Sequence, residues 1–449
     1  MQFQLTTDFL QTVEQLISVK DGNKLRELLQ ELHFADIAEI LEELNSDEAT
    51  YLIKLLASDL TSEALMELDD DVREKILDRL SPSEIAGELS EMDTDDAADV
   101  VAELDDAIQK EVIKQIGDQD LAADIVDLLR YDEDTAGALM AKELVQVKET
   151  WTVAGCVREM RRQAENVTRV HSIYVTNKEG KLTGRLSLKD LLTAAEKTKI
   201  SEVFIPKVDY VTVHTENEEV ARIMQKYDLE AIPVVDEEGV LVGRITIDDI
   251  VDFIKDEAEK DYQMAAGISQ DVEADDSVWQ LTRARLPWLV LGLFGGLGSV
   301  YIMQGFEEAL ARFPILFFFT PLIAAMAGNV GVQSSAIIVQ GLANDNVKGS
   351  LLNRLIKEVG LALINGLALG FLVILYSYAA GLEQLVGITI AVSMLSVIIV
   401  AALVGTFVPI ILDKRGIDPA IATGPFITTS NDIFGIFLFF YIAKVILGF

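Results

Sequence analysis

Apolar residues are distributed unevenly along the chain and divide it into two parts. From Leu286 onward, five apolar segments are each long enough to cross a bilayer, which takes about 20 helical residues. These predicted spans cover residues 286–306, 313–342, 358–382, 385–412 and 422–448. Residues 1–285 contain no comparable segment, and the opening stretch MQFQLTTDFLQTVEQL has neither the basic region nor the apolar core of a signal peptide. The pattern predicts a cytoplasmic amino-terminal part and a polytopic α-helical membrane part.

Residues 24–130 have the apolar spacing of short amphipathic helices. Ile37, Ile40, Leu41 and Leu44 illustrate it, because residues three or four apart lie on one face of a helix. Similar blocks begin at positions 35, 83, 95 and 120, at separations near multiples of twelve. Such a repeat predicts an all-α superhelical domain over residues 1–130, in which each helix buries its apolar face against its neighbours.

A second repeat follows, in which residues 171–192 align without gaps to residues 230–251, a period of 59. Each copy has the pattern strand, glycine-containing turn, strand, helix. This resembles a tandem pair of cystathionine-β-synthase (CBS) domains, an α/β fold, over residues 131–256. The resemblance implies that ATP or another adenine nucleotide is a candidate ligand, although many such pairs bind something else or nothing. In that family an Asp of a Ser/Thr-x-x-Asp element contacts the nucleotide ribose; the matching residues here are Ser187, Asp190, Thr246 and Asp249.

Charge is concentrated in the same amino-terminal part. Of the chain's 37 Lys+Arg and 73 Asp+Glu, residues 286–449 hold only 7 and 8, so residues 1–285 carry almost all of the net charge of −36. Such an acidic surface repels nucleic acid and attracts cations, although solubility alone would also explain it. The single cysteine, Cys156, excludes a disulfide within the chain and a multi-cysteine zinc site.

The acids are densest where the second repeat runs into the membrane part, in a predicted connecting helix and linker over residues 249–276. Helical spacing places Asp249, Asp252 and Asp256 on one face, where like charges repel by roughly a few tenths of a kcal/mol per pair. A bound cation would relieve this repulsion; a solvated face balanced by Lys255 and Lys260 is the alternative. With an acidic turn of the helical domain, the candidate cation-binding residues are Asp95, Asp96, Asp248, Asp249, Asp252, Asp256, Glu257 and Glu259.

Basic residues around the spans predict the orientation of the membrane part. Arg283 and Arg285 stand just before the first span and place its start on the cytoplasmic side. Because successive spans cross the membrane in opposite directions, residues 343–357 and 413–421 are predicted to be cytoplasmic loops. These loops are basic, whereas Arg312 is the only basic residue of the loops on the opposite side. We therefore expect a multi-pass protein of the cell membrane, in contact with the lipid bilayer, with its amino terminus inside and its carboxyl terminus outside.

Asp432 lies inside the fifth predicted span, about 15 Å along the helix from its start. An ionised carboxylate at the centre of a bilayer costs about 3 kcal/mol, so such residues usually face a protein interior or a water-filled path. Asp432 is therefore predicted to mark an ion pathway. Other polar residues of the second and fifth spans are predicted to line it, with bonding between helices as the alternative for the first two; they are Asn329, Gln333, Thr428, Thr429 and Asn431.

The residue types around Asp432 favour Mg²⁺ as the ion. Mg²⁺ keeps several waters and suits one or two carboxylates surrounded by neutral oxygen acceptors. A path for transition metals would be expected to offer His, Cys or Met ligands, and these polar stretches have none at the key positions. One Asp per chain is little charge for a divalent ion, which favours a homodimer with two copies of Asp432 on a central axis.

Taken together, the acidic helical repeat, the CBS pair, the acidic connecting helix and the five spans resemble the MgtE family of magnesium channels or transporters. The stretches LLRYDEDTAGALM (128–140), GNVGVQSS (328–335) and DPAIATGPFITTSND (418–432) look like its signatures. The resemblance implies a homodimer with a central pore, hydrated Mg²⁺ recognised at Asp432, and closure by Mg²⁺ from the cytoplasmic side. The residues flanking Asp432 depart from those of many members, which bears on selectivity more than on the pathway.

The sequence thus predicts a non-enzymatic Mg²⁺ influx pathway that senses cytosolic Mg²⁺ through the acidic residues named above. Its expected parts are the helical domain (1–130), the CBS pair (131–256), the acidic connecting helix and linker (249–276) and the pore domain (277–449). A Mg²⁺ receptor without transport and a CBS-regulated channel for another ion are the alternatives. Intramembrane aspartyl proteolysis needs two paired aspartates, and the spans offer only Asp432 at depth.

Overall fold

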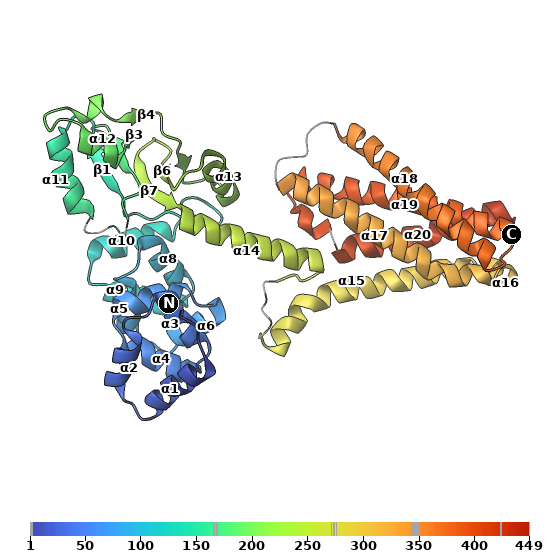
Figure 1. Ribbon diagram of the computed structural model, residues 1–449, viewed down its shortest axis with the longest axis horizontal. Coiled ribbons are helices and arrows are strands. Elements are labelled where there is room, and N and C mark those ends of the chain that lie inside the picture. Colours follow the sequence, from blue (N-terminus) through green and yellow to red (C-terminus); the bar gives the residue numbers. More distant parts are fainter. Residues whose placement is uncertain are drawn as a thin grey trace. The chain divides into compact units, whose positions relative to one another are not determined.

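The computed structural model describes residues 3–164, 167, 169–270, 272, 274, 276–343, 350–422 and 424–448. It divides into two compact units, Met1–Ile254 and Lys255–Phe449, which are described separately below. Figure 1 shows the elements of both units in sequence colours. Lys348, one of the basic residues of a predicted cytoplasmic loop, lies outside the described residues.

The amino-terminal half of the first unit is a stack of short helices (Figure 1). Its apolar stripes are buried as the spacing predicts: Ile37, Ile40 and Leu41 are each at most 1% exposed. Helices two apart pack on each other, α3 on α5, α5 on α7 and α7 on α9, which gives the predicted superhelical arrangement. The helices are α1 Thr7–Ser18, α2 Gly22–Leu29, α3 Phe34–Glu42, α4 Ser46–Leu55, α5 Ser58–Met66, α6 Asp70–Leu77, α7 Pro82–Leu89, α8 Thr94–Ala102, α9 Asp106–Gln115 and α10 Gln119–Leu128.

The two CBS copies share a three-strand arrangement, to which the first copy adds β4, antiparallel to β3. In each, a parallel strand pair is followed by an antiparallel one: β1 pairs with β2 and β2 with β3, as β5 pairs with β6 and β6 with β7. The elements are β1 Val145–Lys148, α11 Val153–Gln163, β2 Ile173–Thr176, β3 Leu182–Leu186, α12 Leu188–Thr193, β4 Ile205–Pro206, β5 Val211–Thr212, α13 Asn217–Tyr227, β6 Ala231–Val235, β7 Leu241–Thr246 and α14 Ile247–Ala266.

The second CBS copy shares its hydrophobic core with the helical domain. Ile125 and Leu128 of α10 belong to the same buried cluster as Val213, Val220 and Ile245. The first copy has a separate core around Val145, Cys156 and Leu191. The shared core brings the start of α8 close to the junction of β7 and α14, where the predicted acids lie.

The second unit contains five helices that are long and apolar enough to span a membrane, among the described residues. Helix α19 occupies the middle and packs on α17, α18 and α20, while α15 packs on α20. Side chains such as Leu289 and Phe371 are exposed, as a lipid-facing surface requires. The helices are α15 Val278–Gly305, α16 Glu307–Arg312, α17 Ile315–Ala343, α18 Leu351–Ala379, α19 Gln384–Asp413 and α20 Gly424–Leu447.

Candidate functional site

Asp432 lines a cavity of about 420 Å³ between α17 and α20. We call this space the membrane cavity. Three of the predicted pathway residues, Asn329, Gln333 and Thr428, line it together with Asp432. The other lining residues are small or apolar: Ala324, Ala325, Gly328 and Val332.

Small residues on α17 let α20 come close enough to form the membrane cavity. A Cβ atom at Gly328 would lie 3.2 Å from Cγ2 of Thr428 and 3.8 Å from Oδ1 of Asp432. Asn329 and Gln333 are four residues apart on α17, as Thr428 and Asp432 are on α20, so each pair shares one helix face. Thr428 Oγ1 donates to the carbonyl oxygen of Gly424 at 2.9 Å. The cavity therefore combines one carboxylate, two amides and one hydroxyl.

Thr429 and Asn431, also predicted to line the pathway, do not line this cavity in the single chain. The side chain of Thr429 lies against Gly295 of α15, and Asn431 is 1% exposed beside Gly331 of α17. Successive helical residues point in directions about 100° apart, so both lie off the face that carries Thr428 and Asp432. Neither amide atom of Asn431 has a hydrogen-bond partner in the described part of the chain. Helical periodicity alone could have separated the two faces.

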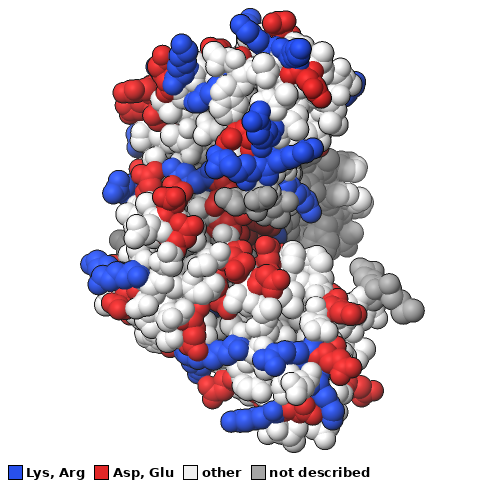
Figure 2. Space-filling model, turned by 90° about the vertical axis from the view of Figure 1, so that its left-hand side faces the viewer, with Lys and Arg blue, Asp and Glu red and all other residues white. Residues whose placement is uncertain are grey.

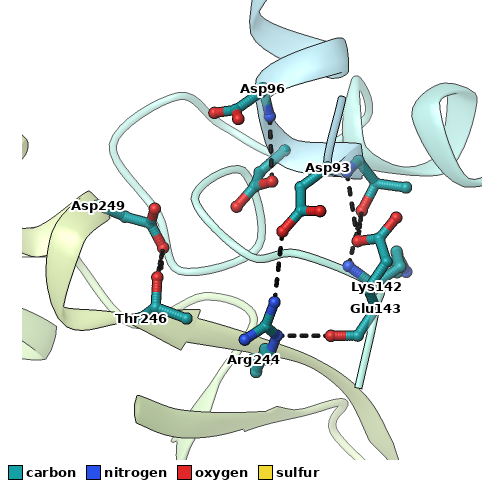
Figure 3. Close-up of polar contacts among 9 residues, drawn as sticks. Asp93, Asp96, Lys142, Glu143, Arg244, Thr246 and Asp249 are labelled. Atoms are coloured by element: carbon teal, nitrogen blue, oxygen red, sulfur yellow. Dashed lines mark hydrogen bonds and ion pairs between the residues drawn. The ribbon is translucent and has the colours of Figure 1, made fainter. Parts of the chain in front are cut away.

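In the first unit, acids from α8 and α14 face one another (Figure 3). Asp95 and Asp96 stand in the first turn of α8, where the helix dipole favours carboxylates, and Asp249 stands in the first turn of α14. We call Asp95, Asp96 and Asp249 the acidic cluster. The carboxylate of Asp249 accepts hydrogen bonds from Thr246 N at 2.9 Å and Thr246 Oγ1 at 2.6 Å. On the face in Figure 2, acidic side chains gather in the middle, below a band of Lys and Arg.

Arg244 and Glu143 border the acidic cluster, and the sequence had not singled them out. The guanidinium of Arg244, which is 5% exposed, contacts Asp93 Oδ2 at 3.4 Å and donates to the Glu143 carbonyl oxygen at 2.5 Å. The Glu143 carboxylate in turn accepts from Thr94 Oγ1 at 2.7 Å. Arg244 lies on the inner face of β7 and Glu143 in a loop, and neither position carries a sequence signal for this contact.

Burial raises the pKa of every acid in the cluster. The pKa of Asp95 is well above its usual range because the group is buried and faces Asp96 and Asp249. Burial and the charge of Asp249 raise the pKa of Asp96 to about 8. Burial also raises the pKa of Asp249, although the bonds from Thr246 oppose it. Carboxylates this crowded are stable only when protonated or when a cation lies among them.

The other predicted cation-binding residues lie along the exposed part of α14. Asp248 and Asp252 are exposed, as are Asp256 and Glu259, and Glu257 pairs with Lys260 at 3.3 Å. The structure therefore brings Asp95, Asp96 and Asp249 together, and Asp248 adds its charge beside Asp249. Within the described residues, no three His, Cys, Asp or Glu side chains are arranged to hold a bare metal ion.

The residues predicted to bind a nucleotide form the same hydrogen bond in both CBS copies, but their surroundings differ. Ser187 Oγ donates to Asp190 Oδ2 at 2.8 Å, as Thr246 Oγ1 does to Asp249. Asp249 also belongs to the acidic cluster, whose charge opposes a polyphosphate.

Three family models match the chain: a divalent cation transporter model named MgtE over residues 320–442, the MgtE intracellular N domain over 32–134, and CBS domains over 136–197 and 200–256. The magnesium transporter MgtE of Thermus thermophilus is 34% identical over 441 residues, 97% of this chain and 98% of the relative. The magnesium transporter MgtE of Bacillus subtilis is 37% identical over 70% of each chain. A crystal structure of the cytosolic domain of the Mg²⁺ channel MgtE in complex with ATP is 36% identical, with a TM-score of 0.52, and covers 54% of this chain and 99% of that one.

Proposed function

The chain belongs to the MgtE family of divalent cation transporters, and from this premise we infer that it conducts Mg²⁺ into the cell and that cytosolic Mg²⁺ closes the pathway. The observation that carries the proposal is the membrane cavity, where Asp432 meets Asn329, Gln333 and Thr428. The relatives named as magnesium transporters support Mg²⁺ as the cargo.

At the membrane cavity, the chemistry is that of a hydrated ion. Mg²⁺ gives up its waters reluctantly, so a single carboxylate can attract it while amide and hydroxyl oxygens accept hydrogen bonds from its water shell. The positive ion offsets the cost of about 3 kcal/mol for a carboxylate in the bilayer core. We place a second chain, with its own Asp432, on the other side of the ion, because two carboxylates balance a divalent charge. The amino terminus is placed inside the cell and the carboxyl terminus outside.

Gating is assigned to the acidic cluster and the acids of α14. When cytosolic Mg²⁺ is scarce, Asp95 and Asp96 repel Asp249, which loosens the contact between α8 and α14. When it is abundant, Mg²⁺ with its waters lies among these carboxylates and tightens that contact. Helix α14 continues from Ile247 to Ala266 and so carries the change toward the first membrane helix. The ion shifts the equilibrium only by its differential affinity for the closed form.

For the first CBS copy, we assign Ser187 and Asp190 to an adenine nucleotide, supported by the ATP complex of the related cytosolic domain. Asp190→Ala should weaken ATP binding to the full chain by about tenfold, the loss of one charge-assisted hydrogen bond. Titration calorimetry measures it, with Asp249→Ala as the matched change in the second copy. ATP affinity lost only in Asp249→Ala would move the nucleotide to the second copy.

The function itself is tested by Mg²⁺ influx into liposomes that contain the purified full chain. Asp432→Ala should lower influx at least tenfold, while Glu383→Gln, at the start of α19, should leave it unchanged. Undiminished influx in Asp432→Ala would place the ion site elsewhere, with Asn329 and Gln333 next to test. No influx in the native chain would favour a Mg²⁺ receptor without transport.

A further inference from the structure

Glu358 is a second carboxylate within a membrane-spanning helix, and the pathway described above does not use it. It lies seven residues into α18 (Leu351–Ala379), about 10 Å along the axis from the end that we place inside the cell. Asp432 lies about 12 Å from the corresponding end of α20, and Ser334 about 14 Å from that of α17. Glu358, Ser334 and Asp432 are therefore at similar depths.

Glu358 contacts the helix that lines the membrane cavity. Ser334 Oγ of α17 donates to Glu358 Oε1 at 2.5 Å, and Ser334 is 6% exposed. Helices α17 and α18 both pack more extensively on α19 than on each other. This hydrogen bond is thus a direct link between them.

Two of the close contacts described for this part of α17 run through glycines, which do little to fix its rotation. A Cβ atom on Gly405 of α19 would overlap the carbonyl oxygen of Gly331 and lie 3.1 Å from Cβ of Ser334. Gly331 in turn lies against Asn431 of α20. Such close, smooth contacts hold helices near each other, but they lack the interlocking side chains that define an angle. A directional hydrogen bond, such as the one from Ser334 to Glu358, does fix the rotation of the helix.

Ser334 directly follows Gln333 in the sequence, and about 100° of helix rotation separates their side chains. Fixing Ser334 therefore fixes the direction of Gln333, and with it Asn329 one turn away. We propose that Glu358 is a positioning residue for ion permeation: by holding Ser334, it sets the rotation of α17 that directs Asn329 and Gln333 into the membrane cavity with Asp432. This inference rests on the proposed function.

Mg²⁺ influx into liposomes tests the proposal with Glu358→Ala, Ser334→Ala and the double variant of the full chain. Each single change should lower influx about fivefold, and the double variant no further, because all three remove the same hydrogen bond. Ser396→Ala is the matched control, since in the described part of the chain Ser396 Oγ donates to the carbonyl oxygen of Val392 in its own helix, at 2.9 Å. Native influx in both single variants, or losses that add in the double variant, would overturn the proposal.

A second measurement separates positioning from a loss of folding or of charge. In a Cys156→Ser background, Gln333→Cys should react with a water-soluble thiol reagent, and adding Glu358→Ala should slow that reaction severalfold. Glu358→Gln, whose amide oxygen can still accept from Ser334, should keep most of both signals. Unchanged thiol reactivity alongside reduced influx would show that Glu358 acts by its charge and would overturn the proposal. If the native chain shows no Mg²⁺ influx, the proposed function is wrong instead. The thiol reaction of Gln333→Cys would still test whether Glu358 sets the direction of Gln333.

Discussion

At the residue scale, the groups around each carboxylate determine whether it forms an ion pair with a basic side chain or is a candidate cation ligand. Asp93 contacts Arg244 at 3.4 Å. In contrast, burial and the charges of Asp96 and Asp249 raise the pKa of Asp95, and burial and the charge of Asp249 raise the pKa of Asp96. The same residue type is thus an ion-pair partner in one place and a candidate cation ligand a few residues away. Sequence spacing identified the acids, but it could not tell which of them would be neutralised by a basic side chain.

From the raised pKa of Asp96, we expect the cytosolic unit to become less stable as pH rises from about 5 to about 8 in Mg²⁺-free buffer. A carboxyl with a raised pKa binds its proton more tightly in the folded chain, so the stabilisation is lost as that proton leaves. One group contributes at most about 1.4 kcal/mol per pH unit. Thermal unfolding of the full chain and of Asp96→Asn measures it. The variant should show a shallower pH dependence, and an equal slope in both would contradict the assignment.

At the element scale, close helix packing builds the membrane cavity and its support. Gly328 lets α20 approach α17 at the cavity, while Gly331 and Gly405 bring α17 near α20 and α19 on its other sides. Small residues serve this purpose in membranes, where helices gain stability from close contact rather than from the hydrophobic effect. The polar face of α17 can therefore point at Asp432 while the rest of the helix stays packed.

Gly405→Ala should destabilise the membrane unit by about 1–3 kcal/mol, because the new methyl group would overlap the carbonyl oxygen of Gly331 and backbone atoms cannot move aside cheaply. Gly296→Ala is the matched control, since no atom lies within 4 Å of a Cβ there. Denaturant unfolding in detergent micelles compares the two. Equal stabilities would show that α17 and α19 are not packed as closely as described.

At the scale of the whole molecule, the acids matter because they lie on or beside α14, which runs from Ile247 to Ala266 and precedes the first membrane helix in the chain. Ion binding in the acidic cluster can affect the pathway only if it favours one conformation of this connection over another. The same coupling requires that a conformation with an open pathway binds cytosolic Mg²⁺ less tightly.

Replacing Asp248, Asp249 and Asp252 together by Asn should leave the pathway open at cytosolic Mg²⁺ concentrations that close the native one. The change removes the carboxylates that Mg²⁺ would hold, so the ion no longer distinguishes the two conformations. Patch recordings with Mg²⁺ varied on the cytoplasmic face measure the concentration for half inhibition, which should rise at least tenfold. Asp118→Asn, which caps α10 away from these acids, is the control. Inhibition at the native concentration in the triple variant would exclude these three acids as the sensor.

Local sequence patterns were enough to predict the architecture and to single out Asp432 as the main candidate site residue. Periodicity of 3.6 residues marked the helices of the first domain, the 59-residue repeat marked the CBS pair, and runs of apolar residues marked the five spans, because each pattern is local in the chain. Asp432 stood out for the same reason, as a charge within an apolar run. Its neighbours Asn329, Gln333 and Thr428 followed from their polarity in the spans.

Which polar side chains lie together depends on tertiary packing. It placed Thr429 and Asn431 against other helices, selected Asp95, Asp96 and Asp249 from eight candidate acids, and brought in Arg244 and Glu143. It also joined Ser334 to Glu358, 24 residues along the chain. These contacts depend on how helices rotate and pack against distant segments. That information resides in the shapes of many side chains at once, and it is absent from any one stretch of sequence.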